Sequence, residues 1–144
     1  MKKKILVVFV ALLIGGCIAY FMFSREYELD SNKVMVKAFQ VGVFTNYDNA
    51  LKVADRNNGI VVSDDSVYRV YVSILSSKEA VDKMKEYYDS IGLHYYLRDI
   101  EVNDEFLNNI KNTEELLIIS NSDTYNIINL NVLNKYEELL WVIW

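Results

Sequence analysis

Polar and aromatic side chains interrupt two apolar segments of this chain, and they are the residues best suited to bind a ligand. The first segment reads AFQVGVF and contains Gln40 and Gly42. Side chains alternate across a β-strand, so these two residues would share one face, opposite the apolar residues between them. Gln40 would offer donors and acceptors to hydroxyl groups, and Gly42 would let a ligand approach the backbone. The second segment, VYRVYVSIL, would turn Arg69 and Tyr71 outward by the same alternation.

An ordinary interpretation of the same residues is also open. Gln40 could be an exposed strand residue without a ligand, because polar residues are the default at a protein surface. Arg69 could pair with Asp99 or Glu101 in a surface salt bridge, which contributes little to stability. The alternation alone does not decide between these interpretations and a binding surface.

Residues for catalysis or metal binding are scarce. The chain has one cysteine, Cys17, and one histidine, His94, which exclude an internal disulfide and are too few for a cysteine or histidine zinc site. There is no Ser-His-Asp order, glycine-rich phosphate loop or recognisable carboxylate pair, and Asp64 with Asp65 is typical of a solvated turn. We therefore expect no enzyme activity and no cofactor. Nucleic acid is also disfavoured, because 15 Lys and Arg stand against 20 Asp and Glu, a net charge of -5.

The N-terminal segment is typical of a membrane anchor. Residues 5–23 are uncharged and mostly apolar, and their length suits a bilayer core about 30 Å thick. The lysines of MKKK precede this stretch and acidic residues follow it, which predicts a cytoplasmic N-terminus and an extracytoplasmic remainder. Alternatives are a cleaved signal peptide and a lipoprotein acylated at Cys17. We expect an anchor over residues 1–23 and a polar linker over residues 24–33.

Strand and helix patterns alternate after the linker. The predicted elements are a strand over residues 35–44, a helix over 46–57, strands over 60–63 and 67–75, a helix over 76–91 and a strand over 94–100. This βαββαβ order predicts an α+β fold, a four-stranded antiparallel sheet with two helices on one face, as in ferredoxin-like and RNP-like domains.

The remaining residues, 103–144, are predicted to be a mainly helical C-terminal extension. Helical patterns cover residues 104–112 and 125–138, whereas residues 116–119 could be strand or helix. The second face of the sheet would be open unless this extension covers it.

Residues 36–102 resemble a SPOR domain, the extracytoplasmic module of bacterial cell-division and sporulation-related proteins. The similarity rests on FQVGVF beginning at Phe39 and YRVYV beginning at Tyr68, which match the family's first and third strands. Smaller matches are Ala50, Ala80 and Gly92. The chain departs from the family at Val43, where a small residue is usual, and at residues 73–75, where SIL replaces G-P-F.

The resemblance implies binding of peptidoglycan glycan strands that lack stem peptides, on the open face of the sheet. Matching the family's last strand adds two residues to the site. The full predicted glycan-binding set is Gln40, Gly42, Arg69, Tyr71, Tyr95 and Leu97. Amide, guanidinium and aromatic groups suit the hydroxyl groups, acetamido groups and ring faces of sugars.

Two functions follow from these expectations. The first is a single-pass, membrane-anchored module over residues 34–102 that binds septal or sporulation-related cell wall. The alternative is a structural or interaction protein of the cell envelope, in which the extension covers the SPOR-like face and the domain binds an envelope or divisome protein.

Overall fold

The computed structural model describes residues 33–143, with side chains up to residue 140. The predicted membrane anchor, the lipidation alternative at Cys17 and all but the end of the linker lie outside these residues. None of the helices that the structure describes is long and apolar enough to cross a membrane. From Val34 onward the chain forms one compact unit.

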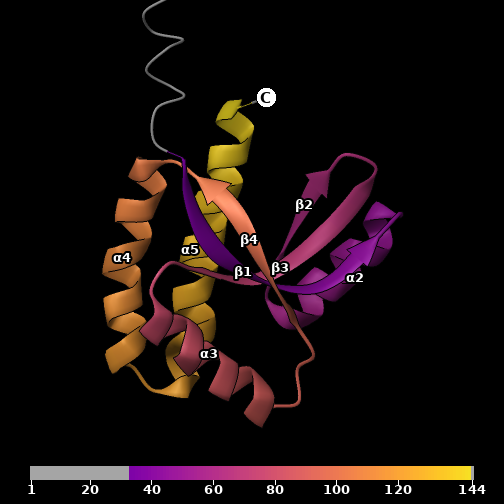
Figure 1. Cartoon of the computed structure of the whole chain (residues 1–144). Helices are drawn as coiled ribbons and strands as arrows, with labels where there is room; N and C mark the ends of the chain where they lie inside the picture. Colours follow the sequence, from indigo (N-terminus) through magenta and orange to yellow (C-terminus); the bar gives the residue numbers. More distant parts are fainter. Residues whose placement is uncertain (1–32, 144) are drawn as a thin grey trace, which may run out of the picture. The chain divides into compact units, whose positions relative to one another are not determined.

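A four-stranded antiparallel sheet forms the centre of this unit (Figure 1). Its strands stand in the order β2-β3-β1-β4. The first six elements are β1 (Val34–Phe44), α2 (Tyr47–Asn57), β2 (Ile60–Asp64), β3 (Val67–Leu75), α3 (Lys78–Ser90) and β4 (Tyr96–Val102). The predicted βαββαβ fold class is therefore confirmed.

The helices begin and end where the sequence places its capping residues. The Asn46 side chain accepts a hydrogen bond from the Asn49 N–H (3.1 Å) and caps the start of α2. The helix ends at Asn58, whose φ of 52° is left-handed. Gly92 follows α3 with a φ of 70°. The predicted last strand, 94–100, is wrong by two residues, because the connection after α3 continues to Tyr95 and strand β4 then runs to Val102.

The helices α2 and α3 cover one face of the sheet. Phe39 and Val72 pack against the apolar side of α3, and Val70 packs against Ala50 and Ala54 of α2. Phe39 lies fully buried at the centre of an aromatic group, with its ring centroid 5.2 Å from that of Tyr88. This face is therefore the expected apolar side of the βαββαβ unit.

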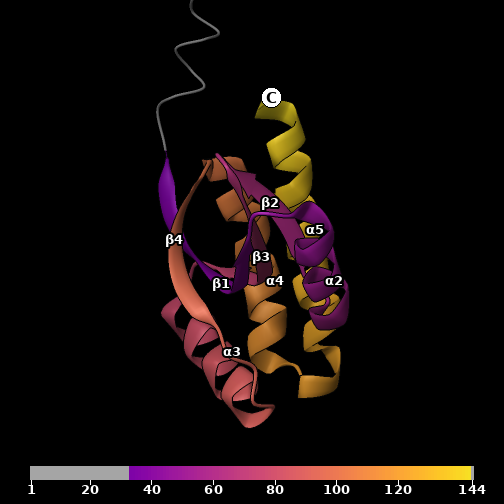
Figure 2. The same cartoon turned by 90° about the vertical axis from the view of Figure 1, so that its right-hand side faces the viewer.

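Two C-terminal helices cover much of the opposite face. These are α4 (Asp104–Ile119) and α5 (Ser122–Ile143), which run side by side (Figures 1 and 2). Residues 116–119, which the sequence leaves undecided, are helical. The two helices contribute Phe106, Ile110, Val132, Leu133 and Tyr136 to a core shared with the sheet residues Val36, Ala38, Tyr71, Ile74, Ile100 and Val102. The extension is thus part of the folded core and makes the sheet the middle of three layers.

Buried polar side chains join the extension to the rest of the fold. The Asn129 side chain of α5 accepts a hydrogen bond from the Ser73 hydroxyl (2.9 Å) of β3 and also lies 3.5 Å from the Tyr88 hydroxyl. Glu114 of α4 is 3% exposed and accepts hydrogen bonds at the start of α3. Among the described residues, no buried side-chain nitrogen or oxygen lacks a partner. These bonds fix the position of the extension because an unpaired buried polar group is costly.

Alkaline pH is expected to destabilise this packing through Tyr136. Burial raises the pKa of Tyr136 to about 12; Tyr71 and Asp64 act in the same direction and Arg98 opposes them. A tyrosine in the unfolded chain has a pKa of about 10, so the unfolded state releases this proton first. The contribution is fully present below about pH 10 and falls by on the order of 2 kcal/mol as the pH rises to about 12. Urea unfolding between these pH values should show the loss, and Tyr136→Phe should reduce it; an identical pH dependence in the variant would contradict the assignment.

Candidate functional site

Four side chains, one from each strand, form a polar cluster on the face of the sheet that α5 only partly covers. The polar cluster consists of Gln40 (β1), Asp64 (β2), Arg69 (β3) and Arg98 (β4). Arg69 donates from Nε to Asp64 Oδ2 (2.5 Å) and from a terminal nitrogen to Gln40 Oε1 (3.1 Å). Arg98 donates to the same Asp64 oxygen at 3.1 Å. One carboxylate oxygen therefore holds both guanidinium groups in place.

The polar cluster is accessible and carries a surplus positive charge. The side chain of Arg69 is 19% exposed, that of Asp64 is 34% exposed and that of Arg98 is 37% exposed. Two guanidinium groups share one carboxylate, so the cluster has a formal charge of one positive unit in a chain whose net charge is -5. Guanidinium groups bind carboxylates and amide oxygens in a fixed, planar geometry. The cluster can thus bind a polar or anionic ligand.

The sheet register places two exposed apolar side chains beside the polar cluster. Tyr96 of β4 lies opposite Gln40 and is 66% exposed. Val43 of β1 lies opposite Arg69 and is 45% exposed. An exposed tyrosine beside fixed polar groups combines contact area with directional hydrogen bonding.

Of the six predicted site residues, the structure brings Gln40 and Arg69 into direct contact. In the alternative interpretation, Arg69 could pair with Asp99 or Glu101. Its ion-pair partner is instead Asp64, and Asp99 pairs with Lys37 at 2.6 Å. The reason is that Asp99 points to the opposite face from Arg69, with Lys37.

Tyr71 is on the predicted face but is not open to a ligand. It lies opposite Gln40, and α5 covers it so that it is 2% exposed. Burial is the main cause that raises the pKa of Tyr71 above its usual value, while Arg98 and Arg69 oppose the shift. The prediction that Tyr71 belongs to an open glycan-binding surface is therefore wrong. At this residue the extension covers the sheet, which is the alternative that the sequence left open, because the side chains of α5 pack on the same apolar surface.

Gly42 faces the other side of the sheet. The register between β1 and β3 shifts between Gln40 and Gly42, and Gly42 lies opposite Val70, which belongs to the α2 side. A Cβ at Gly42 would lie 2.4 Å from the Phe44 ring, which packs on the same side. The prediction that Gly42 admits a ligand is wrong because a bulge breaks the simple alternation of the strand. The glycine instead makes room for Phe44.

Tyr95 and Leu97 also lie on the α3 side. Leu97 is opposite Phe39 and packs with it, and the Tyr95 ring centroid is 5.0 Å from that of Phe39. The prediction that Tyr95 and Leu97 share a face with Gln40 is therefore wrong. The register of the last strand differs by one residue from the predicted register, and a shift of one residue moves every side chain of a strand to the other face. Tyr96 and Arg98 take their places beside Gln40.

Asp64, Tyr96 and Arg98 are not among the residues predicted from the sequence to form the site. The sequence does contain features that could have indicated them. Tyr96 and Arg98 stand at alternate positions of the strand YLRDIEV, and Asp64 is the last residue before the β2–β3 turn. No group of three His, Cys, Asp or Glu side chains among the described residues could hold a metal ion.

The fold and the polar cluster define an α+β domain with one partly open, polar sheet face. No protein family model matches the chain, and no curated protein matches it. A solved structure is similar to it: the solution structure of the peptidoglycan binding domain of the B. subtilis cell wall lytic enzyme CwlC. The similarity covers 51% of this chain and 98% of that chain, with 22% sequence identity and a TM-score of 0.39.

Proposed function

We propose that this protein binds peptidoglycan glycan strands, in the cell envelope, through the polar cluster. The observation that carries the proposal is the contact of Gln40 with Arg69, beside the exposed Tyr96, on the sheet of a βαββαβ domain. The sequence resemblance of residues 36–102 to SPOR domains supports it. The ligand would be glycan lacking stem peptides, and the role would be binding, without catalysis.

The chemistry of the ligand fits the polar cluster. Sugar rings offer apolar faces to an aromatic side chain, and their hydroxyl and acetamido groups need both donors and acceptors. Glycan from which the stem peptides have been removed by an amidase also has free lactyl carboxylates. The surplus guanidinium charge would attract these carboxylates, so binding should weaken as the salt concentration rises.

The proposed location is the outer side of the cytoplasmic membrane. Residues 5–23 would anchor the chain in the cytoplasmic membrane, with the domain of residues 34–102 and its C-terminal extension outside the cell membrane. Septal or sporulation-related wall is the proposed target.

Sedimentation with peptidoglycan tests the proposed ligand. A fragment of residues 31–144, which contains the whole compact unit, should sediment with amidase-treated peptidoglycan more than with intact peptidoglycan. Gln40→Ala and Arg69→Ala should each weaken binding about tenfold, because each removes hydrogen bonds to the ligand. Lys37→Ala is the control, since Lys37 is also basic but pairs with Asp99 on the opposite face. Equal binding by all four proteins would count against the polar cluster as the site.

A second candidate function is favoured by the burial of Tyr71 under α5. That helix removes part of the face on which the predicted glycan site depends. A domain in this state could act as an interaction or structural protein of the envelope. A correctly folded fragment that binds neither form of peptidoglycan would support this candidate over the first.

A further inference from the structure

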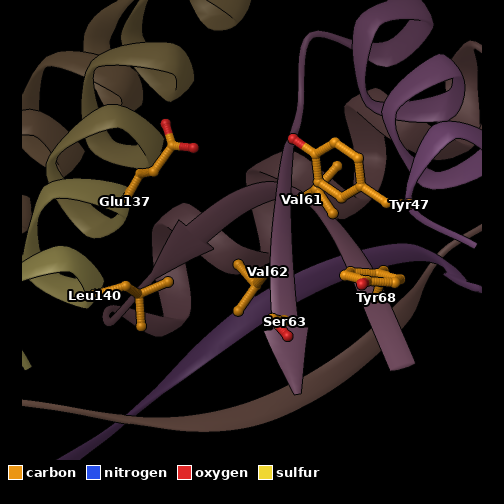
Figure 3. Close-up of a pocket in the computed structure, with 7 residues that line it drawn as sticks. All are labelled: Tyr47, Val61, Val62, Ser63, Tyr68, Glu137 and Leu140. Atoms are coloured by element: carbon orange, nitrogen blue, oxygen red, sulfur yellow. The ribbon is translucent and has the colours of Figure 1, made fainter. Parts of the chain in front are cut away.

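A cleft of about 410 Å³ lies at the β2 edge of the sheet, between α2 and α5 (Figure 3). Tyr47 and Tyr68 form one wall, and Glu137 and Leu140 of α5 form the other. Residues 61–63 of β2 lie between the two walls. The volume is within the range of small-ligand sites, and the lining combines apolar surface with a few polar groups.

The two tyrosines present a half-exposed aromatic surface. Their ring centroids are 5.4 Å apart with an interplanar angle of 74°, so the Tyr47 ring is held edge-to-face against Tyr68. Tyr47 is 49% exposed although it belongs to this aromatic pair. A fixed aromatic ring that remains in contact with solvent gives a ligand contact area at little entropic cost.

Polar groups stand on the other sides of the cleft. Glu137 is exposed on α5 and Ser63 is exposed on β2, so a carboxylate and a hydroxyl group line the same space as the two rings. A carboxylate accepts hydrogen bonds from neighbouring hydroxyl groups, and the tyrosine rings suit the apolar face of a sugar ring. This set of groups fits a neutral sugar.

The cleft adjoins the polar cluster along β2. Ser63 lines the cleft and lies opposite Tyr68, on the α2 side of the sheet, whereas Asp64, the next residue, belongs to the polar cluster on the other face. The cleft and the polar cluster therefore meet around the edge that β2 forms. Val62, also in the lining, lies opposite Arg69. Three strand spacings separate β4 from β2, so a surface from Tyr96 to this edge is about 14 Å wide. A chain-like ligand is better suited than a single sugar to use both sites.

We propose that the cleft is a second sugar subsite, which binds a further residue of a glycan strand held by the polar cluster. This inference rests on the proposed function and adds to it a site that the βαββαβ unit alone does not form, because Glu137 and Leu140 come from α5. An added peptide strand is disfavoured at this edge, since β2 has only five residues and ends at Asp64, which a second aspartate, Asp65, follows.

Glycan strands of two lengths test the proposal. The full chain, kept in mild detergent, is titrated with long amidase-denuded glycan strands and with disaccharide fragments of the same material. Tyr47→Ala should weaken binding of long strands about fivefold, the effect of one aromatic contact. Glu137→Gln should weaken it about threefold through the loss of charged hydrogen bonds. Both variants should bind the short fragments as the wild type does.

Matched controls separate the cleft from general effects on the fold. Leu51→Ala changes another exposed apolar residue of α2, and Glu138→Gln changes the carboxylate next to Glu137; neither residue lines the cleft. Both controls should bind long strands within about twofold of the wild type. If the cleft variants bind long strands like the controls while Gln40→Ala weakens binding, the subsite is wrong and the proposed function stands. If the wild type binds neither length, both are overturned.

Discussion

A chain that ends at Val102 will not fold into a stable domain. The cut removes Phe106, Ile110, Val132, Leu133 and Tyr136, all of which are buried against the sheet. Five such side chains contribute on the order of 10 kcal/mol, which is comparable to the whole stability of an ordinary domain. The cut also exposes Val36, Ala38 and Ile74 to water.

Urea unfolding followed by circular dichroism provides the measurement. The fragment of residues 31–144 should show one cooperative transition, and the fragment of residues 31–102 should show none. A cooperative transition in the shorter fragment would mean that residues 31–102 fold independently and do not need α4 and α5 for stability. If that fragment also bound glycan more tightly, the extension would be a cover over the site.

Replacing Glu114 will cost more than any other single polar substitution considered for this fold. Its carboxylate accepts hydrogen bonds from the Ser76 N–H, the Ser76 hydroxyl (3.0 Å) and the Ser77 N–H (3.1 Å). Ser77 is the N-cap of α3, so the negative charge also lies at the favourable end of the helix dipole. Glu114→Ala leaves these donors without their acceptor and should lower the free energy of unfolding by about 3 kcal/mol.

Two further variants make this prediction specific. Glu114→Gln keeps an oxygen acceptor in nearly the same place and should cost about 1 kcal/mol. Glu115→Ala removes the neighbouring carboxylate, which is exposed, and should change stability by less than about 0.5 kcal/mol. Denaturant midpoints of the three variants give the comparison. If Glu114→Ala and Glu115→Ala lowered the free energy of unfolding equally, the hydrogen bonds between α4 and the start of α3 would not contribute to stability.

The order of elements could be predicted because the local signals agree with the fold. The valine-rich and aromatic-rich composition of β1 and β3, the asparagine cap of α2 and the glycine after α3 each depend on a few neighbouring residues. The shared face of Gln40 and Arg69 also follows from alternation, and the two side chains contact each other because β1 and β3 are neighbours in the sheet. These features need no knowledge of distant parts of the chain.

The rest of the site depends on interactions that alternation does not encode. A bulge near Gly42 and the start of β4 at Tyr96 each displace the pattern by one residue, which exchanges the two faces. The burial of Tyr71 depends on where α5 docks, and the period of a helix gives its apolar side but not its partner. In the sequence, nothing distinguishes Glu114 from the other acidic residues of its helix. Its role depends on its contact with the start of α3, which only the structure shows.

Binding of glycan at the polar cluster is the central claim, and nuclear magnetic resonance tests it most directly. The ¹⁵N-labelled fragment of residues 31–144 is titrated with amidase-denuded glycan strands, and the backbone amides and the side-chain signals of Gln40, Arg69 and Arg98 are followed. We predict that these signals and the Tyr96 amide shift together and saturate. Shifts confined to the outer surface of α3, or no shifts from a folded protein, would contradict the account.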